Sequence, residues 1–191
     1  YDEAEVYYTE ALETSRRVLG YEHPDTLWSI NNMGVLLLDQ GKYDEAEVYC
    51  TESLEGRRRV LGDEHPDTLA SIHNMGVLRS NQGKYDESEV YYTEALETSR
   101  RVLGDEHPGT LWLISSMGVL RSNQGKYDDA EVYYTEAWET SRRVLGDEHP
   151  DTLTFINDLA ELYDEWEKPE EAQKYRDMLP EEDAVAKDTN E

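Results

Sequence analysis

The sequence predicts an all-α solenoid of antiparallel helix pairs. A Tyr-Asp opening recurs at Tyr1, Tyr43, Tyr85 and Tyr127, so the chain repeats with the 42-residue spacing that separates Tyr1 from Tyr43. Each period contains two segments whose apolar residues follow helical spacing, and no segment shows the alternation typical of strands. Neither helix can bury its apolar face alone, so successive pairs are expected to stack on one another.

One helix of each pair follows the Tyr-Asp opening and is called here the Tyr-Asp helix. In the second copy, Asp44 is expected to be its N-cap, with Glu47 three positions on completing a capping box. Gly62, after three arginines, is expected to end it. The chain opens with such a helix, over residues 1–20, that has no preceding partner.

The other helix of each pair follows a His-Pro dipeptide and is called the His-Pro helix. Pro66 suits its first position, where the missing N–H costs nothing, and Gly83 is expected to end it. Gly34, Gly76 and Gly118 recur in the middle of these helices, where glycine costs about 1 kcal/mol relative to alanine. This recurrence predicts a close approach between helices.

About nine helices are therefore expected in a single solenoid over residues 1–179, followed by an acidic, disordered tail over 180–191. The predicted repeats after the opening helix are 21–62, 63–104, 105–146 and 147–179.

The composition limits the classes of partner. The chain has 44 acidic and 18 basic residues, a formal charge of −26, which argues against nucleic acid and anionic membranes. No apolar run is long enough to span a bilayer, and the opening residues do not look like a signal peptide. The single cysteine, Cys50, fits a reducing compartment, so we expect a cytoplasmic protein.

Recurrent small and large residues at fixed places identify the type of repeat. They are Met33-Gly34, Gly41, Ala46, Cys50 and Ser53, then Met75-Gly76, Gly83, Ser88, Tyr92 and Ala95, then Met117-Gly118, Gly125, Ala130, Tyr134 and Ala137. This pattern resembles the tetratricopeptide repeat, and the 42-residue period with its His-Pro punctuation resembles the kinesin-light-chain type. Arg79 and Arg121 depart from it, because the family usually has an apolar or aromatic residue there.

The resemblance implies a right-handed superhelix whose concave wall is lined by the His-Pro helices and binds peptides or protein segments. The variable face of those helices then predicts the binding residues. These are Trp28, Asn31, Asn32, Val35, Leu38, Asp39, His73, Asn74, Val77, Ser80, Asn81, Trp112, Ser115, Val119, Ser122, Asn123, Asn157 and Glu161.

The expected ligand is a peptide with apolar side chains near the first three His-Pro helices and basic residues near the fourth, where Glu161 lies. Trp28 and Trp112 are the expected anchors, because tryptophan is frequent among interface hot spots. The alternative is that both tryptophans pack against neighbouring helices. The Asn side chains could likewise grip a peptide backbone or form hydrogen bonds between helices.

A second hypothesis is structural. The apolar face of the opening helix, formed by Val6, Tyr7, Ala11 and Leu12, has no preceding helix to cover it, and it could mediate self-association.

Catalysis, metals and cofactors are not expected. His23, His65, His107 and His149 recur once per period, too far apart to share an ion, so they are expected to cap loops. Cys50 replaces a tyrosine of the other copies and is expected to be a small core residue. The sequence contains no phosphate-binding loop, nucleophile elbow or dinucleotide motif, so we expect no enzyme.

Overall fold

The computed structural model describes residues 2–180, and every regular element in that range is an α-helix, as predicted. The helices are α1 (Asp2–Leu19), α2 (Pro24–Asp39), α3 (Tyr43–Leu61), α4 (Pro66–Asn81), α5 (Tyr85–Leu103), α6 (Pro108–Asn123), α7 (Tyr127–Leu145), α8 (Pro150–Glu165) and α9 (Pro169–Arg176). The predicted tail, apart from Pro180, lies outside the described residues.

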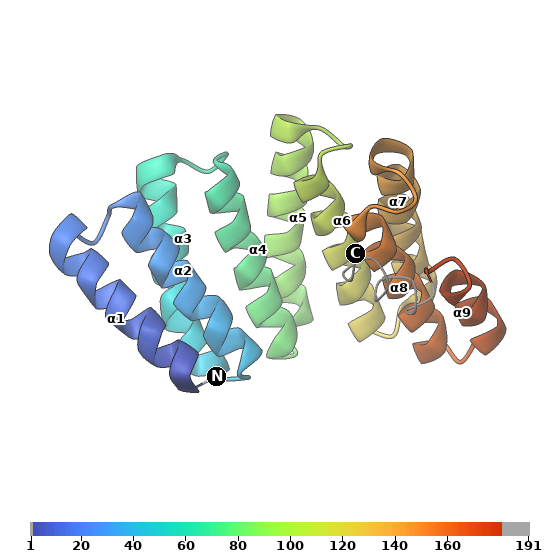
Figure 1. The fold of residues 1–191 in the computed structure, drawn as a ribbon, viewed down its shortest axis with the longest axis horizontal. Coiled ribbons are helices and arrows are strands. Elements are labelled where there is room, and N and C mark those ends of the chain that lie inside the picture. The colour runs from blue at the N-terminus through green and yellow to red at the C-terminus, as the bar shows by residue number, and fades with distance from the viewer. Residues whose placement is uncertain (1, 181–191) are drawn as a thin grey trace, which may run out of the picture. The chain divides into compact units, whose positions relative to one another are not determined.

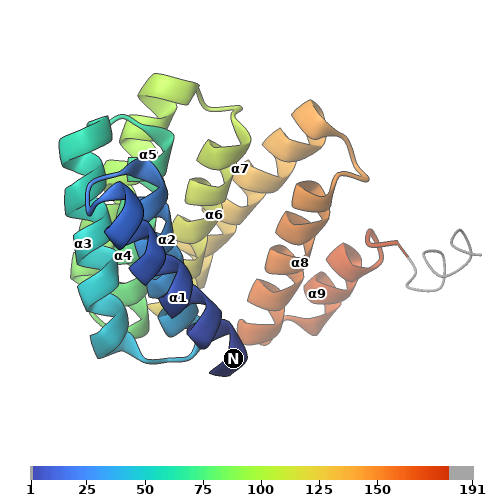
Figure 2. The ribbon, with the colours of Figure 1, turned by 60° about the vertical axis from the view of Figure 1, so that its left-hand side comes forward.

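The chain divides after Gly104 into two compact units, residues 1–104 and 105–191, at one of the predicted repeat boundaries. The first unit contains α1 to α5 and the second contains α6 to α9. Within each unit, every His-Pro helix packs against the helix that follows it: α2 on α3, α4 on α5, α6 on α7 and α8 on α9 (Figure 1 and Figure 2). Each unit is therefore a stack of helical hairpins.

The histidines of the His-Pro dipeptides cap the helices that follow them, as predicted. In all four copies the histidine Nδ1 accepts a hydrogen bond from the backbone N–H two residues on, at 3.2 Å for His23, 3.1 Å for His65, 3.1 Å for His107 and 3.2 Å for His149. This bond satisfies one of the free N–H groups at each helix start.

The predicted N-cap at Asp44 is wrong. Helix α3 begins two residues earlier than an N-cap at Asp44 implies, at Tyr43, and its N-cap is Lys42, whose side chain makes no capping bond. The reason is the tight turn that closes α2. The N–H of Lys42 bonds to the Leu37 carbonyl at 2.9 Å, while the Lys42 carbonyl already accepts from the Ala46 N–H at 2.9 Å. Lys42 thus ends one helix and starts the next, and Asp44 lies in the first helical turn.

The same turn recurs in each hairpin with a residue at positive φ. In the second hairpin Gly83 has φ +73°, its N–H bonds to the Ser80 carbonyl, and the next N–H bonds to the Arg79 carbonyl, which is a Schellman arrangement. Glu167 occupies this place in the last hairpin with φ +59° and, within residues 2–180, is the sole non-glycine residue with positive φ. A side chain is strained in this region.

The mid-helix glycines mark close contacts, as predicted. A Cβ atom on Gly76 would overlap Tyr92 Cδ1, and one on Gly118 would lie 2.9 Å from Tyr134 Cδ1. In the first hairpin, a Cβ on Gly34 would lie 2.9 Å from Cys50 Sγ. The side chain of each Tyr-Asp helix therefore fills the space that the glycine leaves open.

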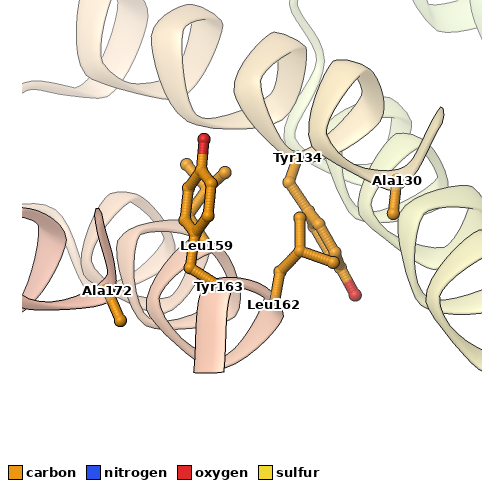
Figure 3. Packing of buried hydrophobic residues seen from close by; sticks show 6 residues of the cluster. All are labelled: Ala130, Tyr134, Leu159, Leu162, Tyr163 and Ala172. Carbon is orange, nitrogen blue, oxygen red and sulfur yellow. The ribbon is translucent and has the colours of Figure 1, made fainter. Parts of the chain in front are cut away.

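Apolar side chains from successive helices fill the interior of each unit. In the second unit, the core cluster consists of Ala130, Tyr134, Leu159, Leu162, Tyr163 and Ala172. Figure 3 shows Leu162 of α8 beside the Tyr134 ring of α7. In the first unit, Leu12 of α1 packs with Leu27 and Ile30 of α2, and Tyr49 of α3 covers them.

Arg79, which departs from the family pattern, ties three helices together. Its guanidinium donates a hydrogen bond to Glu47 of α3 at 2.9 Å and forms an ion pair with Glu87 of α5, with Nε and Oε2 3.1 Å apart. The hydrogen bonds from Arg79 and Gln82 lower the pKa of Glu47 to about 2. An arginine is thus accommodated because carboxylates from both neighbouring helices reach it.

Candidate peptide-binding surface

Two tryptophans occupy equivalent positions of α2 and α6, two repeat periods apart, and both are exposed. Trp28 is 58% exposed and Trp112 is 43% exposed. The Trp112 ring packs edge-on against Phe155 of α8, with the ring centroids 5.2 Å apart. Trp28 thus offers most of its surface to solvent, whereas Trp112 combines packing with exposure.

The other predicted residues of α2 divide between surface and core. Asp39 is exposed, and Asn32 and Val35 are half-buried. The placement of Leu38 on the surface is wrong, because Leu38 is buried. Helix α2 contacts α1, α3 and α4, so its buried arc is wide and includes this position.

Asn31 takes part in hydrogen bonds between helices. Its Oδ1 accepts from Arg57 Nη1 of α3 at 3.0 Å and from Asn74 Nδ2 of α4 at 3.1 Å. Both asparagines are half-buried, so each keeps some accessible surface. The inter-helix role is confirmed for these two residues, and contact with a peptide stays a prediction.

Helix α4 presents less surface than predicted. Asn81 is exposed, while His73 and Val77 are half-buried. Ser80 is buried, which corrects its predicted place on the surface, because α4 contacts α2, α3 and α5 and its buried arc includes this position. The His73 ring stacks on Tyr92 at 5.5 Å, and burial lowers the pKa of His73, which keeps it neutral at physiological pH.

In the second unit, α6 and α8 share polar contacts. Val119 and Asn123 are exposed, and Ser122 donates to Glu165 at 2.5 Å. Ser115 is buried, contrary to the prediction, because its hydroxyl turns toward α8 and donates to Asp158 Oδ2 at 2.9 Å.

The exposed face of α8 is acidic. Asn157 and Glu161 are exposed and are joined by a hydrogen bond of 2.7 Å. Asp164 and Glu165 are also exposed. Burial raises the pKa of the nearby Asp158 carboxyl, and the negative charge of Glu161 raises it further. This face is suited to a cationic group.

Two charged residues of these junctions were missed by the sequence analysis: Arg57 and Asp158. Arg57 stands where Ser99 and Ser141 stand in the later copies, and Asp158 stands where Asn74 stands in the second. Both residues could have been found by comparing the inward-facing positions of the four repeat copies, and not the outer face alone, because a charged residue replaces a neutral one at each position.

The predicted self-association face is only partly open. Val6, Tyr7 and Ala11 are exposed, and Tyr7 is 72% exposed. Leu12 is buried against Leu27 and Ile30 of α2, so its inclusion in an uncovered face is wrong.

The described residues contain no group of three or more His, Cys, Asp or Glu side chains placed to hold a metal ion. Cys50 is buried, as predicted, and burial raises the pKa of its thiol to about 11. Across residues 2–180, no helix combines the length and hydrophobicity that crossing a membrane requires.

Comparisons with known proteins agree with this architecture. One model of the tetratricopeptide repeat family matches residues 69–140 and 113–175, and a second matches residues 1–25 and 26–67. No curated protein sequence matches the chain.

Solved structures share the fold at low sequence identity. BtubC (BKLC) from P. vanneervenii is 22% identical with a TM-score of 0.73, covering 95% of this chain and 75% of that one. A Podosopora anserina protein, described as a kinesin light chain with nearly identical TPR-like repeats, is 22% identical with a TM-score of 0.70, covering 100% of this chain and 89% of that one. A variant of that protein gives a TM-score of 0.72 at 22% identity, with coverage of 92% and 83%. With family models that together match most of its length, the chain belongs to the tetratricopeptide repeat family.

Proposed function

We propose that this chain is a non-catalytic scaffold that binds a peptide or protein segment along the exposed face of its His-Pro helices. Tetratricopeptide repeats generally mediate protein–protein interaction, which is the class of function expected here. The observation that carries the proposal is the exposure of Trp28, a large apolar side chain placed among half-buried asparagines. Such a side chain gains by transfer from water to a protein interface.

The chemistry of the two units indicates the kind of ligand. Apolar side chains are expected to contact Trp28 and Trp112, and a basic side chain is expected beside Glu161 and Asp158 of α8. The net charge of −26 favours the approach of a basic partner at low salt. The single, buried cysteine fits a cytoplasmic location.

The test is the double substitution Trp28→Ala with Trp112→Ala, measured against peptides selected from a random library on the parent protein. The expected result is a loss of affinity of about tenfold or more, since truncated hot-spot tryptophans cost that much. Val48→Ala is the matched control, because Val48 is exposed on α3 rather than on a His-Pro helix. Peptides that bind the double variant as well as they bind the parent contradict the proposal.

Self-association through α1 is the second candidate, and one comparison favours it. Tyr7 is 72% exposed, whereas its equivalent Tyr49 covers the cluster that Leu12 forms with α2. Tyr7 stands at the same register but has nothing to cover among the described residues. A second copy could provide that surface.

Light scattering on a size-exclusion column tests this candidate over a concentration series at low and high salt. Self-association predicts a mass that rises with concentration and rises further with salt, because screening weakens the repulsion between acidic chains. Tyr7→Ser is expected to abolish the rise. A constant mass of 22.1 kDa at both salt levels contradicts it.

A further inference from the structure

The turn between α8 and α9 departs from the repeat at two successive positions. The residue that follows the His-Pro helix is a glutamine in the first three hairpins, at Gln40, Gln82 and Gln124, whereas it is Trp166 in the fourth. The next residue is Glu167, which adopts φ +59° where the other turns have glycine. Strain of this kind persists only where the surrounding structure holds the backbone in place, and it often marks a functional position.

Two further aromatic rings hold the Trp166 ring in place. The ring centroid of Tyr127 in α7 lies 5.9 Å from that of Trp166 with an interplanar angle of 31°, and that of Tyr163 in α8 lies 5.9 Å away at 11°. Tyr163 is buried in the core cluster (Figure 3), whereas Trp166 and Tyr127 are half-buried. The indole is therefore fixed by contacts with two helices and still keeps accessible surface.

The Trp166 ring already attracts a positive charge. The ammonium nitrogen of Lys168 lies 3.0 Å from the ring centroid, which is a cation–π contact. Lys168 is exposed, and within residues 2–180 it forms no ion pair. Three glutamates lie within three residues of it along the chain, at Glu167, Glu170 and Glu171. The ammonium group thus contacts the indole although carboxylates are close by in the sequence.

A surface cavity of about 240 Å³ adjoins the two half-buried rings. Its wall consists of Gly125, Lys126, Tyr127, Asp128, Asp129 and Trp166. The two aspartate side chains are exposed, and in the described part of the chain they form no hydrogen bond or ion pair. They outnumber the one basic side chain of the wall, so the cavity combines an aromatic wall with a net negative charge.

The start of α5 has the same charges without the tryptophan. A cavity of about 270 Å³ there is lined by Gly83, Lys84, Tyr85, Asp86 and Glu87, which stand one period before the residues from Gly125 to Asp129. Carboxylates in the first turn suit the positive end of any helix, so these acidic residues alone do not indicate a ligand. The cavity at α7 differs from the one at α5 in its indole wall.

We propose that the cavity formed by Tyr127, Asp128, Asp129 and Trp166, called here the Trp166 pocket, binds a weakly hydrated organic cation of a partner protein. The cation is the guanidinium of an arginine or the methylated ammonium of a modified lysine. Both groups stack on aromatic rings, and they give up less hydration than an unmodified lysine ammonium does. The two aspartates supply the opposing charge. The pocket lies outside the peptide-binding residues assigned above, so this inference does not rest on the proposed function.

The first experiment is a titration of the full chain with tetramethylammonium and with methylguanidinium, followed by nuclear magnetic resonance at constant ionic strength. tert-Butanol, which resembles tetramethylammonium in shape but has no charge, is the control ligand. The indole N–H of Trp166 and the backbone amides of Asp128 and Asp129 are expected to shift and to saturate with at least one cation, and to shift little with tert-butanol. The cation that binds more tightly distinguishes an arginine ligand from a methylated lysine.

Two substitutions change the aromatic wall and the charge beside it. Trp166→Gln introduces the residue of the other three hairpins, so the fold is expected to tolerate it. It is expected to weaken cation binding about fivefold, which corresponds to about 1 kcal/mol for a cation–π contact. Lys168→Ala is expected to strengthen binding, because it removes a positive charge from the indole and loses no capping bond. A merely structural role of Trp166 does not predict this increase.

The carboxylates have a matched control at α5. Asp128→Asn combined with Asp129→Asn is expected to weaken cation binding, because the opposing charge is lost. Asp86→Asn combined with Glu87→Gln changes the net charge of the chain equally and is expected to leave binding unchanged. The double substitution Trp28→Ala with Trp112→Ala is also expected to leave it unchanged, so the Trp166 pocket is measured independently of the proposed function.

The outcomes decide the proposal. Equal responses to the cations and to tert-butanol, or no saturating response to either cation, overturn it. Binding that the α5 variant weakens as much as the α7 variant does also overturns it, because binding then follows the net charge alone. Binding that Trp166→Gln weakens and Lys168→Ala strengthens supports it.

Discussion

The junction of α2, α3 and α4 in the first unit and that of α6, α7 and α8 in the second are built on the same frame but carry opposite charges. Both begin with a histidine cap, both contain a mid-helix glycine, and both have an exposed tryptophan one turn from the junction. The first contains a buried arginine that donates to neutral acceptors, and the second contains Asp158 with a raised pKa. The helix caps and the close contacts at glycine are therefore common to both units. The polar residues at inward-facing positions differ between the units, and they determine the charge of each junction.

The largest expected difference between the junctions concerns the mid-helix glycines. Gly118→Ala places a Cβ 2.9 Å from two carbon atoms of the Tyr134 ring, which cannot rotate away in a packed interior. We expect it to lower the free energy of unfolding by about 2 kcal/mol, a typical cost of overpacking. A Cβ atom at Gly34 would lie 2.9 Å from Cys50 Sγ and 3.3 Å from the Cys50 backbone N, so Gly34→Ala meets no ring and is expected to cost less than Gly118→Ala. Urea denaturation followed by circular dichroism measures both, and equal costs contradict the assignment of the rings as the obstacle.

The next largest difference is expected between the two tryptophans, in how much each substitution changes the free energy of unfolding. Trp112→Ala removes an edge-on contact with Phe155 and is expected to lower the free energy of unfolding by about 1.5 kcal/mol. Trp28→Ala is expected to change it by less than about 0.5 kcal/mol, as for other surface substitutions. Thermal denaturation of the two variants decides between a binding and a packing role for each. A large decrease in stability for Trp28→Ala would show that Trp28 is needed for packing and is not available as a binding residue.

The turn between α8 and α9 is expected to give a smaller change in the free energy of unfolding, and of opposite sign. Glu167 adopts φ +59° where the other hairpins have glycine, so Glu167→Gly is expected to raise the free energy of unfolding by about 1 kcal/mol through relief of this strain. The reverse change, Gly125→Glu, places a side chain at φ +71° and is expected to lower it by a similar amount. Calorimetric melting temperatures measure both, and a destabilised Glu167→Gly variant contradicts this account of the turn.

The smallest expected effects are pH dependences of opposite sign in the two units. The folded-state pKa of Glu47 is about 2, below its ordinary 4.5, so Glu47 stabilises the first unit above pH 4.5 and this stability is lost as the pH falls toward 2. The folded-state pKa of Asp158 is raised above 3.8, so its contribution is present below pH 3.8 and is lost as the pH rises through the raised value.

Glu47→Gln is therefore expected to lower the melting temperature near neutral pH, with a difference from the parent that shrinks in acid. Asp158→Asn is expected to raise the melting temperature near neutral pH, again with a difference that shrinks in acid. The Glu47 effect is modest because that side chain is partly exposed and water screens its ion pair. If both substitutions shift the melting temperature near neutral pH in the same direction, the causes assigned to the two pKa shifts are wrong.

The sequence was sufficient for the elements that depend on local chemistry. The histidine caps, the turn glycines and the close approach at Gly76 follow from residue types at fixed spacing, and the structure confirms them. The start of α3 was misplaced because Asp44 looks like a cap in isolation, whereas the turn before it already occupies the N-cap position at Lys42.

The candidate surface was harder to predict, because helical spacing assigns a face but not the width of its buried arc. Leu38, Ser80 and Ser115 have the correct spacing for the outer face, yet a helix that contacts several neighbours buries them. Arg57 was missed because an arginine near a helix end is ordinarily a solvated group opposed to the dipole. Only the three-dimensional arrangement brings Asn31, Ser71 and the Asp67 carbonyl to it.

The most direct test of the opposite-charge comparison is chemical-shift mapping of the full chain with two sets of otherwise identical short peptides, one carrying a glutamate and the other a lysine beside a leucine. The account predicts that the lysine peptides perturb the Trp112 indole and the backbone around Asp158 more strongly than the glutamate peptides do. Equal perturbation of these groups by both sets, or a stronger perturbation by the glutamate peptides, would contradict it.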